Sequence, residues 1–126
     1  MLKLDTNYVL RFIINDNEEQ AEIVRNTICY EKAELNICVI AEVIYVLRNF
    51  YEFDREEITK AVNMFINIDN VITEDKAVVI KSLELFSTYR KLDFVDCILL
   101  SYHFVNGDTI LTFDKEMNKL LNREKE

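Results

Sequence analysis

The sequence has no proline, one glycine (Gly107) and one histidine (His103). The scarcity of turn-forming residues predicts short connections and mostly helical structure. One glycine excludes a P-loop and a G-x-G-x-x-G loop, because each motif needs more than one. One histidine excludes an imidazole-rich zinc site. Nucleotide-binding enzymes of these types and zinc enzymes built on histidine are therefore not expected.

Paired cysteines and long apolar runs are also missing. Cys29, Cys38 and Cys97 are odd in number and widely spaced, so neither a thiolate zinc site nor a C-x-x-C redox motif is expected. Free thiols suit a reducing cytoplasm. The longest apolar run, Ile37–Leu47, is interrupted by Glu42 and falls short of the roughly 18 residues that suggest a membrane span. The N-terminus shows no secretion signal. We expect a cytoplasmic protein without a membrane segment.

The 126 residues, half of them hydrophobic and 30% charged, predict a single globular domain over residues 1–126. The formal charge of −8 argues against a passive nucleic-acid binder, which is normally basic. It does not exclude a nuclease, because divalent ions can neutralise a cluster of carboxylates.

Short apolar runs separated by helical segments predict a three-layer α/β/α fold with a short central parallel sheet flanked by helices. Strands are expected at Leu2–Leu4, Leu35–Val39, Val71–Ile72 and Thr109–Thr112. Helices are expected at Tyr8–Ile14, Glu18–Tyr30, Ile40–Tyr51, Arg55–Ile68, Glu74–Arg90, Phe94–Val105 and Asp114–Leu121. Asp54 and Glu57 form an expected capping box. The functional crevice of such a sheet lies beyond the carboxyl ends of its strands, where Asp5 and Asp114 are expected.

Two acidic residues stand out in the first half of the chain. Asp5 directly follows the first strand, where it either binds a cation or caps the next helix; both readings stay open. Glu42 is the only charged residue between Asn36 and Arg48. Its apolar neighbours predict a buried carboxylate that needs a partner, because an unpaired buried charge costs several kcal/mol. The alternative places Glu42 in solvent, opposite a stripe formed by Ile40, Val43, Ile44 and Leu47.

Three further acidic residues lie near the C-terminus. Asp93 and Asp96 are three residues apart, which puts both on one side of a first helical turn. Asp93 is a good N-cap, and Asp96 occupies the position that reaches back to the cap. The buried stripe of this helix is expected to contain Val95, Ile98, Leu99, Tyr102 and Val105. Because Asp96 borders that stripe, it is favoured over Asp93 as a ligand. Asp114 is a ligand or a cap, and the Thr112 hydroxyl can hold a carboxylate or a water.

The remaining reactive side chains do not form a site. His103 lies about 10 Å along the helix from Asp96, by the rise of roughly 1.5 Å per residue, and is read as structural or exposed. Cys97 points away from Asp96, and no histidine is placed to activate it.

The acidic residues named above would form an all-oxygen cluster, and hard oxygen ligands select magnesium or manganese. The expected chemistry is in-line hydrolysis of a phosphodiester by metal-activated water.

Four segments in this order and spacing carry a family resemblance: LDTN at 4–7, IAEVIYVL at 40–47, DFVDCILL at 93–100 and LTFDKEM at 111–117. The chain resembles PIN-domain ribonucleases over essentially its whole length, and within them the VapC-type toxins of toxin–antitoxin pairs. The resemblance implies a catalytic, metal-binding set of Asp5, Glu42, Asp96 and Asp114. Asp93 is an uncertain fifth ligand, and Asn7 and Thr112 are supporting residues.

The resemblance also implies partners: an RNA substrate, a second copy in a homodimer, and a cognate antitoxin whose C-terminal segment lies over the active-site groove. RNA needs positive charge near the cluster. Cations near the ends of the relevant elements, each of which also reads as an ordinary surface charge, are Arg11, Arg48, Arg90, Lys91 and Lys115.

Three other functions compete with this interpretation. A receiver-type regulatory module needs adjacent acids after its first strand, and LDTN supplies one. An inactive PIN-like interaction module is disfavoured because all four carboxylates are present. The sequence does not clearly distinguish the toxin from a PIN-like nuclease of RNA processing or one acting on DNA. The compact length favours the toxin.

Overall fold

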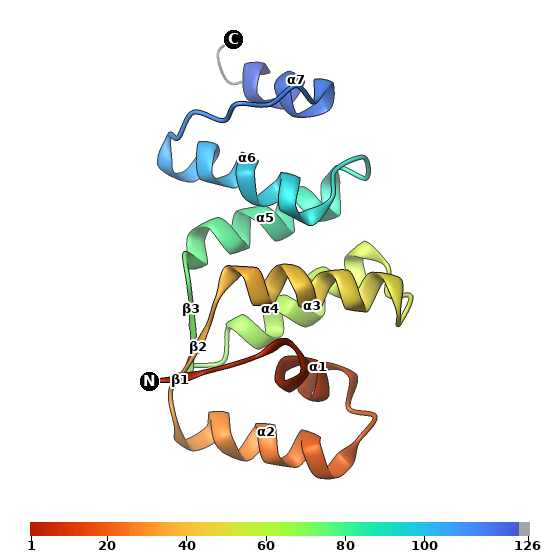
Figure 1. The fold of residues 1–126 in the computed structure, drawn as a ribbon, viewed down its shortest axis with the longest axis vertical. Helices are drawn as coiled ribbons and strands as arrows, with labels where there is room; N and C mark the ends of the chain where they lie inside the picture. The colour runs from red at the N-terminus through yellow and green to blue at the C-terminus, as the bar shows by residue number, and fades with distance from the viewer. Residues whose placement is uncertain (124–126) are drawn as a thin grey trace. The chain divides into compact units, whose positions relative to one another are not determined.

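The computed structural model describes residues 1–123 of the chain. By its internal contacts the chain divides into two compact units, which we call the N-terminal unit (Met1–Asp75) and the C-terminal unit (Lys76–Glu126). The elements follow in the order β1 (Leu2–Lys3), α1 (Thr6–Ile14), α2 (Glu18–Tyr30), β2 (Ala33–Leu35), α3 (Ile37–Asn49), α4 (Arg55–Ile66), β3 (Val71–Thr73), α5 (Lys76–Thr88), α6 (Phe94–Asn106) and α7 (Lys115–Arg123) (Figure 1).

The sheet belongs to the N-terminal unit. β1 pairs with β2 and β2 pairs with β3, both in parallel, with Leu2 opposite Ala33 and Ala33 opposite Val71. Figure 1 shows the three strands beside the N-terminus. Because the strands are parallel, their carboxyl ends share one edge of the sheet, and Asp5 follows β1 at that edge. The predicted parallel sheet with intervening helices is confirmed.

The helices of the N-terminal unit bury the apolar faces that their sequence periodicity predicts. α1 packs against α2 and α3, and α3 packs against α4. The predicted stripe of α3 is confirmed, since its four members are at most 2% exposed: Ile40, Val43, Ile44 and Leu47. The capping box of α4 is also confirmed, with Asp54 and Glu57 each accepting the other's backbone N–H.

The start of α3 differs from the prediction. A strand was expected to reach Val39, but β2 ends at Leu35 and α3 begins at Ile37. The cause lies far away in the sequence: the Glu74 carboxylate accepts the Ile37 N–H at 2.8 Å, while the Glu74 N–H donates to the Leu35 carbonyl at 3.0 Å. One residue thus bonds both to the last residue of β2 and to the first residue of α3.

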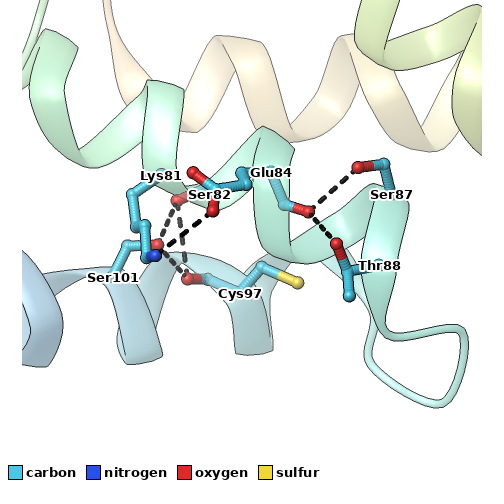
Figure 2. Close-up of polar contacts among 7 residues, drawn as sticks. All are labelled: Lys81, Ser82, Glu84, Ser87, Thr88, Cys97 and Ser101. Carbon is cyan, nitrogen blue, oxygen red and sulfur yellow. Dashed lines mark hydrogen bonds and ion pairs between the residues drawn. The ribbon is translucent and has the colours of Figure 1, made fainter.

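The C-terminal unit is held together by the α5–α6 pair. Ser82 on α5 and Ser101 on α6 are both fully buried, and their hydroxyl oxygens lie 3.0 Å apart (Figure 2). Ser82 also donates to the Val78 carbonyl at 2.7 Å, and Ser101 donates to the Cys97 carbonyl at 2.7 Å. Buried hydroxyls need such partners, because an unpaired one costs about 1–3 kcal/mol.

The predicted strand at Thr109–Thr112 is wrong. Within the described residues this segment pairs with no strand, since all three strands lie in the N-terminal unit and the C-terminal unit has only helices. Leu111 is 92% exposed and Phe113 is fully exposed. Apart from β2, whose end shifts by four residues, and α3, whose start shifts by three, the other predicted elements are confirmed, with ends shifted by at most two residues. The prediction of a single domain stays a prediction. No helix among residues 1–123 is long and apolar enough to cross a membrane.

Candidate functional site

Asp5 and Glu42 line the same pocket of the N-terminal unit. Its volume is about 690 Å³. Asp5 comes from the end of β1 and Glu42 from α3, so the pocket lies where the sheet edge meets that helix. The other lining residues are Thr6, Asn7, Leu10, Arg11, Val46, Phe50 and Tyr51. The structure thus brings together two of the predicted ligands and the supporting residue Asn7.

Asp5 is the N-cap of α1, and its Oδ1 accepts the Tyr8 N–H at 2.8 Å. The sequence left open whether Asp5 caps the helix or binds a cation, and this geometry is compatible with both. A carboxylate has two oxygens with about four lone pairs, so capping leaves acceptors for a cation. The cap also fixes the side chain in the pocket rather than leaving it to rotate freely.

Glu42 is exposed, so the expectation that it is buried among apolar neighbours is wrong. It lies on α3 opposite the buried stripe, as the alternative reading predicted, and its carboxylate faces the pocket instead of the core. The free energy cost of an unpaired buried charge therefore does not arise. Its role as a ligand stays a prediction. Cys38, one turn earlier on α3, is likewise exposed.

Arg11 brings a guanidinium group to the carboxylate pocket, where the sequence had marked it only as one of several nearby cations. Its Nη1 lies 2.8 Å from Asp16, and its Nη2 donates to the Tyr51 hydroxyl at 3.3 Å. Its buried Nε has no hydrogen-bond partner among the described residues. Two carboxylates and a partly engaged guanidinium in one pocket can hold a cation together with an anionic ligand.

In the C-terminal unit, Asp93 and Asp96 form the predicted capping box at the start of α6. Asp93 Oδ1 accepts the Asp96 N–H at 2.8 Å, and Asp96 Oδ2 lies 3.4 Å from the Asp93 nitrogen that donates to it. Asp93 is exposed and Asp96 is half-buried. This difference agrees with the preference for Asp96 as the inward-facing residue.

The pKa of Asp96 is raised above the ordinary aspartate value. Partial burial is the main cause, and the negative charges of Asp93 and Asp114 also oppose its ionisation. The effect of Asp114 shows that this third carboxylate belongs to the same neighbourhood. A cation at such a cluster would favour the ionised form and lower the pKa.

The predicted buried stripe of α6 is wrong. Val95, Leu99 and Val105 are each more than 40% exposed. The buried residues are instead Phe94, Cys97, Leu100 and Ser101. α6 is apolar nearly all round, so its periodicity does not determine which face meets α5. Cys97 is fully buried, in agreement with its predicted direction away from a site.

Asp114 precedes α7 and caps it, with Oδ1 accepting the Met117 N–H at 2.9 Å. The Thr112 hydroxyl accepts the Asp114 N–H at 3.0 Å and lies 3.8 Å from the Met117 sulfur. Thr112 therefore holds the backbone of Asp114 in place. His103 has its Nδ1 at 2.9 Å from the Asp108 carbonyl, which fits a structural role.

The carboxylates fall into two groups, Asp5 with Glu42 and Asp96 with Asp93 and Asp114. Within residues 1–123, no three side chains of His, Cys, Asp or Glu are positioned to hold a metal ion. The oxygen donors of each group nevertheless suit a hard divalent cation. A single cluster of all four predicted ligands stays a prediction.

A family model described as PIN domain matches residues 3–121. The chain belongs to the PIN-domain family. Its seven helices, within the described residues, and its short three-stranded parallel sheet fit the PIN-like α/β/α fold. PIN-domain proteins are generally metal-dependent nucleases, so this PIN-domain chain is a member of a nuclease superfamily. No curated protein matches the chain.

Proposed function

We propose that this PIN-domain protein is a Mg²⁺- or Mn²⁺-dependent endoribonuclease that hydrolyses phosphodiester bonds of RNA. The observation that carries the proposal is the pocket in which Asp5 and Glu42 accompany Arg11, in a chain of a nuclease family. Carboxylates provide ligands for a hard cation, and a guanidinium suits the phosphate that such a cation binds.

In this proposal, Asp5, Glu42, Asp96 and Asp114 would hold the divalent ion, with Asp93 as a candidate fifth ligand. A divalent ion bound there supplies Lewis-acid stabilisation of the phosphate and lowers the pKa of water. Arg11 orients a phosphate oxygen. Asn7 and Thr112 support the site, Asn7 from the pocket wall and Thr112 through its hydrogen bond to the Asp114 backbone.

We further propose that the protein is the toxin of a type II toxin–antitoxin pair of the VapC type. It would act in the cytoplasm as a homodimer and be inhibited by a cognate antitoxin. The net charge of −8 supports a partner rich in basic residues, because opposite charges speed association. A PIN-like nuclease of RNA processing or one that cuts DNA is the alternative.

The test is cleavage of a labelled RNA by the purified protein with Mg²⁺, Mn²⁺ or EDTA. Asp5→Asn and Asp96→Asn are each expected to lower the rate about 100-fold or more, because even residues that merely support metal ligands contribute about 10- to 100-fold. Each asparagine keeps an oxygen that can accept the capping hydrogen bond. The control is Asp69→Asn, at an exposed aspartate outside both carboxylate groups.

Circular dichroism and the Tm would show that the variants remain folded. Cleavage that persists in EDTA, or wild-type rates in both variants, would contradict the proposal. Cleavage of DNA but not of RNA under the same conditions would select the alternative.

A further inference from the structure

A second pocket, of about 380 Å³, lies within the C-terminal unit, and four of its nine lining residues are cations. We call it the basic pocket. One wall is the connection from α5 to α6, and the other is α7. Its lining residues are Thr88, Tyr89, Arg90, Lys91, Leu92, Glu116, Lys119, Leu120 and Arg123.

α7 presents one face to the basic pocket. Glu116, Lys119, Leu120 and Arg123 are spaced by three, four and seven residues, which places them on the same side of a helix. Leu120 is only 8% exposed and Leu92 only 1% exposed. The floor is therefore apolar, whereas Lys119 and Arg123 are exposed at the rim.

The charge of the basic pocket is opposite to that of the chain. The pocket holds four of the chain's 15 lysines and arginines but one of its 23 acidic residues. That one, Glu116, has its carboxylate 3.6 Å from the Lys91 amine in an exposed ion pair, and such pairs are weak and exchange readily. Clustered cations on an acidic protein create a local positive potential that attracts anions.

We propose that the basic pocket binds the phosphate groups of an RNA strand, and that Lys119 and Arg123 are positioning residues for the substrate. This inference rests on the proposed function. Phosphates bind lysine as a point charge and arginine by two parallel hydrogen bonds, so this pair suits a phosphodiester backbone. Both residues lie outside the two clusters of candidate metal ligands described above.

RNA is favoured over an acidic peptide by the lining and by the family. Tyr89 contributes an aromatic ring beside the cations, and single-stranded RNA is bound by cations combined with rings on which bases stack. The chain belongs to a family of nucleases. A polyanion without bases would contact only the cations of the pocket and would gain nothing from the aromatic ring.

The experiment compares two double variants that remove the same charge. Lys119→Gln/Arg123→Gln changes the basic pocket, and Lys32→Gln/Lys60→Gln changes two exposed lysines of the N-terminal unit. Binding of a fluorescein-labelled 12-nucleotide RNA is measured by anisotropy over a range of salt concentrations, in EDTA to prevent metal-dependent cleavage. The pocket variant is expected to bind about 10-fold more weakly. Its slope of log affinity against log salt should fall by about 1.4, since each phosphate contact of a single strand contributes roughly 0.7.

Equal losses in the two double variants would overturn the proposal, because they would reflect net charge rather than a site. So would unchanged binding in the pocket variant. A third overturning result is a glutamate peptide of equal length and charge that binds the wild type as tightly as RNA does. Circular dichroism would verify that both variants are folded.

The outcomes separate this inference from the proposed nuclease activity. Loss of RNA binding in the pocket variant of a protein that cleaves no RNA would support the basic pocket and refute the ribonuclease. RNA cleavage with wild-type kcat and KM in the pocket variant, together with wild-type binding, would refute the basic pocket and leave the ribonuclease standing. A raised KM with unchanged kcat is the result expected if both proposals hold.

Discussion

Asp96 combines two roles that make opposite demands on its charge. As part of the capping box it accepts a backbone hydrogen bond, while partial burial and its neighbours Asp93 and Asp114 raise its pKa. A carboxyl group that binds its proton more tightly in the folded protein than in the unfolded chain makes the free energy of unfolding fall as pH rises between the two pKa values. Above the folded pKa, the ionised side chain lowers stability.

The substitution Asp96→Asn is therefore expected to raise the Tm of the metal-free protein at pH 7. It should also weaken the loss of stability that occurs as pH rises above the ordinary aspartate pKa of 3.8. Asparagine keeps a carbonyl oxygen for the Asp93 N–H. Thermal unfolding in EDTA from pH 4 to pH 8 measures both effects, with Asp69→Asn as the control. An equal or lower Tm at pH 7 would argue against an unfavourable charge at Asp96.

Individual caps were predictable from the sequence because their partners lie three residues away. Asp93 with Asp96 and Asp54 with Glu57 follow this local rule. The exposure of Glu42 was not determined by the sequence, because apolar residues on both sides of it in the chain lie on only one face of the folded helix. The pocket beside Glu42 depends on where β1 and α1 place Asp5 and Arg11.

At the scale of elements, long-range contacts limited what the sequence could indicate. α3 begins at Ile37 because Glu74, 37 residues away, accepts its N–H. Thr109–Thr112 has the apolar character of a strand, but a strand needs hydrogen bonds from a neighbouring strand. The C-terminal unit offers none within the described residues. Helices with clear caps were predicted well, because their hydrogen bonds are internal.

The α5–α6 pair gives a prediction at this scale. Ser82→Ala is expected to lower the free energy of unfolding by about 1 kcal/mol, because it removes hydrogen bonds to Val78 and Ser101 from a fully buried position. The matched control is Ser87→Ala, also on α5 but exposed, where a change below about 0.5 kcal/mol is expected. Urea unfolding measures both.

A double-mutant cycle with Ser101→Ala sharpens this test. The two substitutions should be non-additive, because the hydroxyls contact each other (Figure 2). Additive losses, or equal losses at Ser82 and Ser87, would show that the buried pair contributes no coupling.

At the scale of the whole molecule, the candidate ligands come from both ends of the sequence. If Asp5, Glu42, Asp96 and Asp114 bind one ion, Mn²⁺ or Mg²⁺ should stabilise the folded chain, by about 2.7 kcal/mol when the ion is at 100 times its Kd. Asp5→Asn and Asp114→Asn should each remove most of the rise in Tm. Differential scanning fluorimetry measures it, with NaCl of matched ionic strength as the control.

A rise in Tm that only one of the two variants removes would contradict a single shared site. It would indicate that one of the two carboxylate clusters, either the N-terminal or the C-terminal one, binds the ion alone.

The fold class and the family were predictable from the order of the four segments. The grouping of the carboxylates depends on tertiary structure, which spacing along the chain does not determine.

The exposed thiol of Cys38 makes the candidate pocket accessible to spectroscopy without a new cysteine. Cys38 precedes Glu42 by one turn of α3, whereas Cys97 is fully buried and protected from labelling reagents. With Cys29 replaced by serine, a nitroxide attached at Cys38 would sit beside the carboxylates. A paramagnetic Mn²⁺ ion that binds there would change the relaxation of that spin label, whereas Mg²⁺ would not. The native Cys38 thiol therefore allows a direct measurement of whether the metal binds in this pocket.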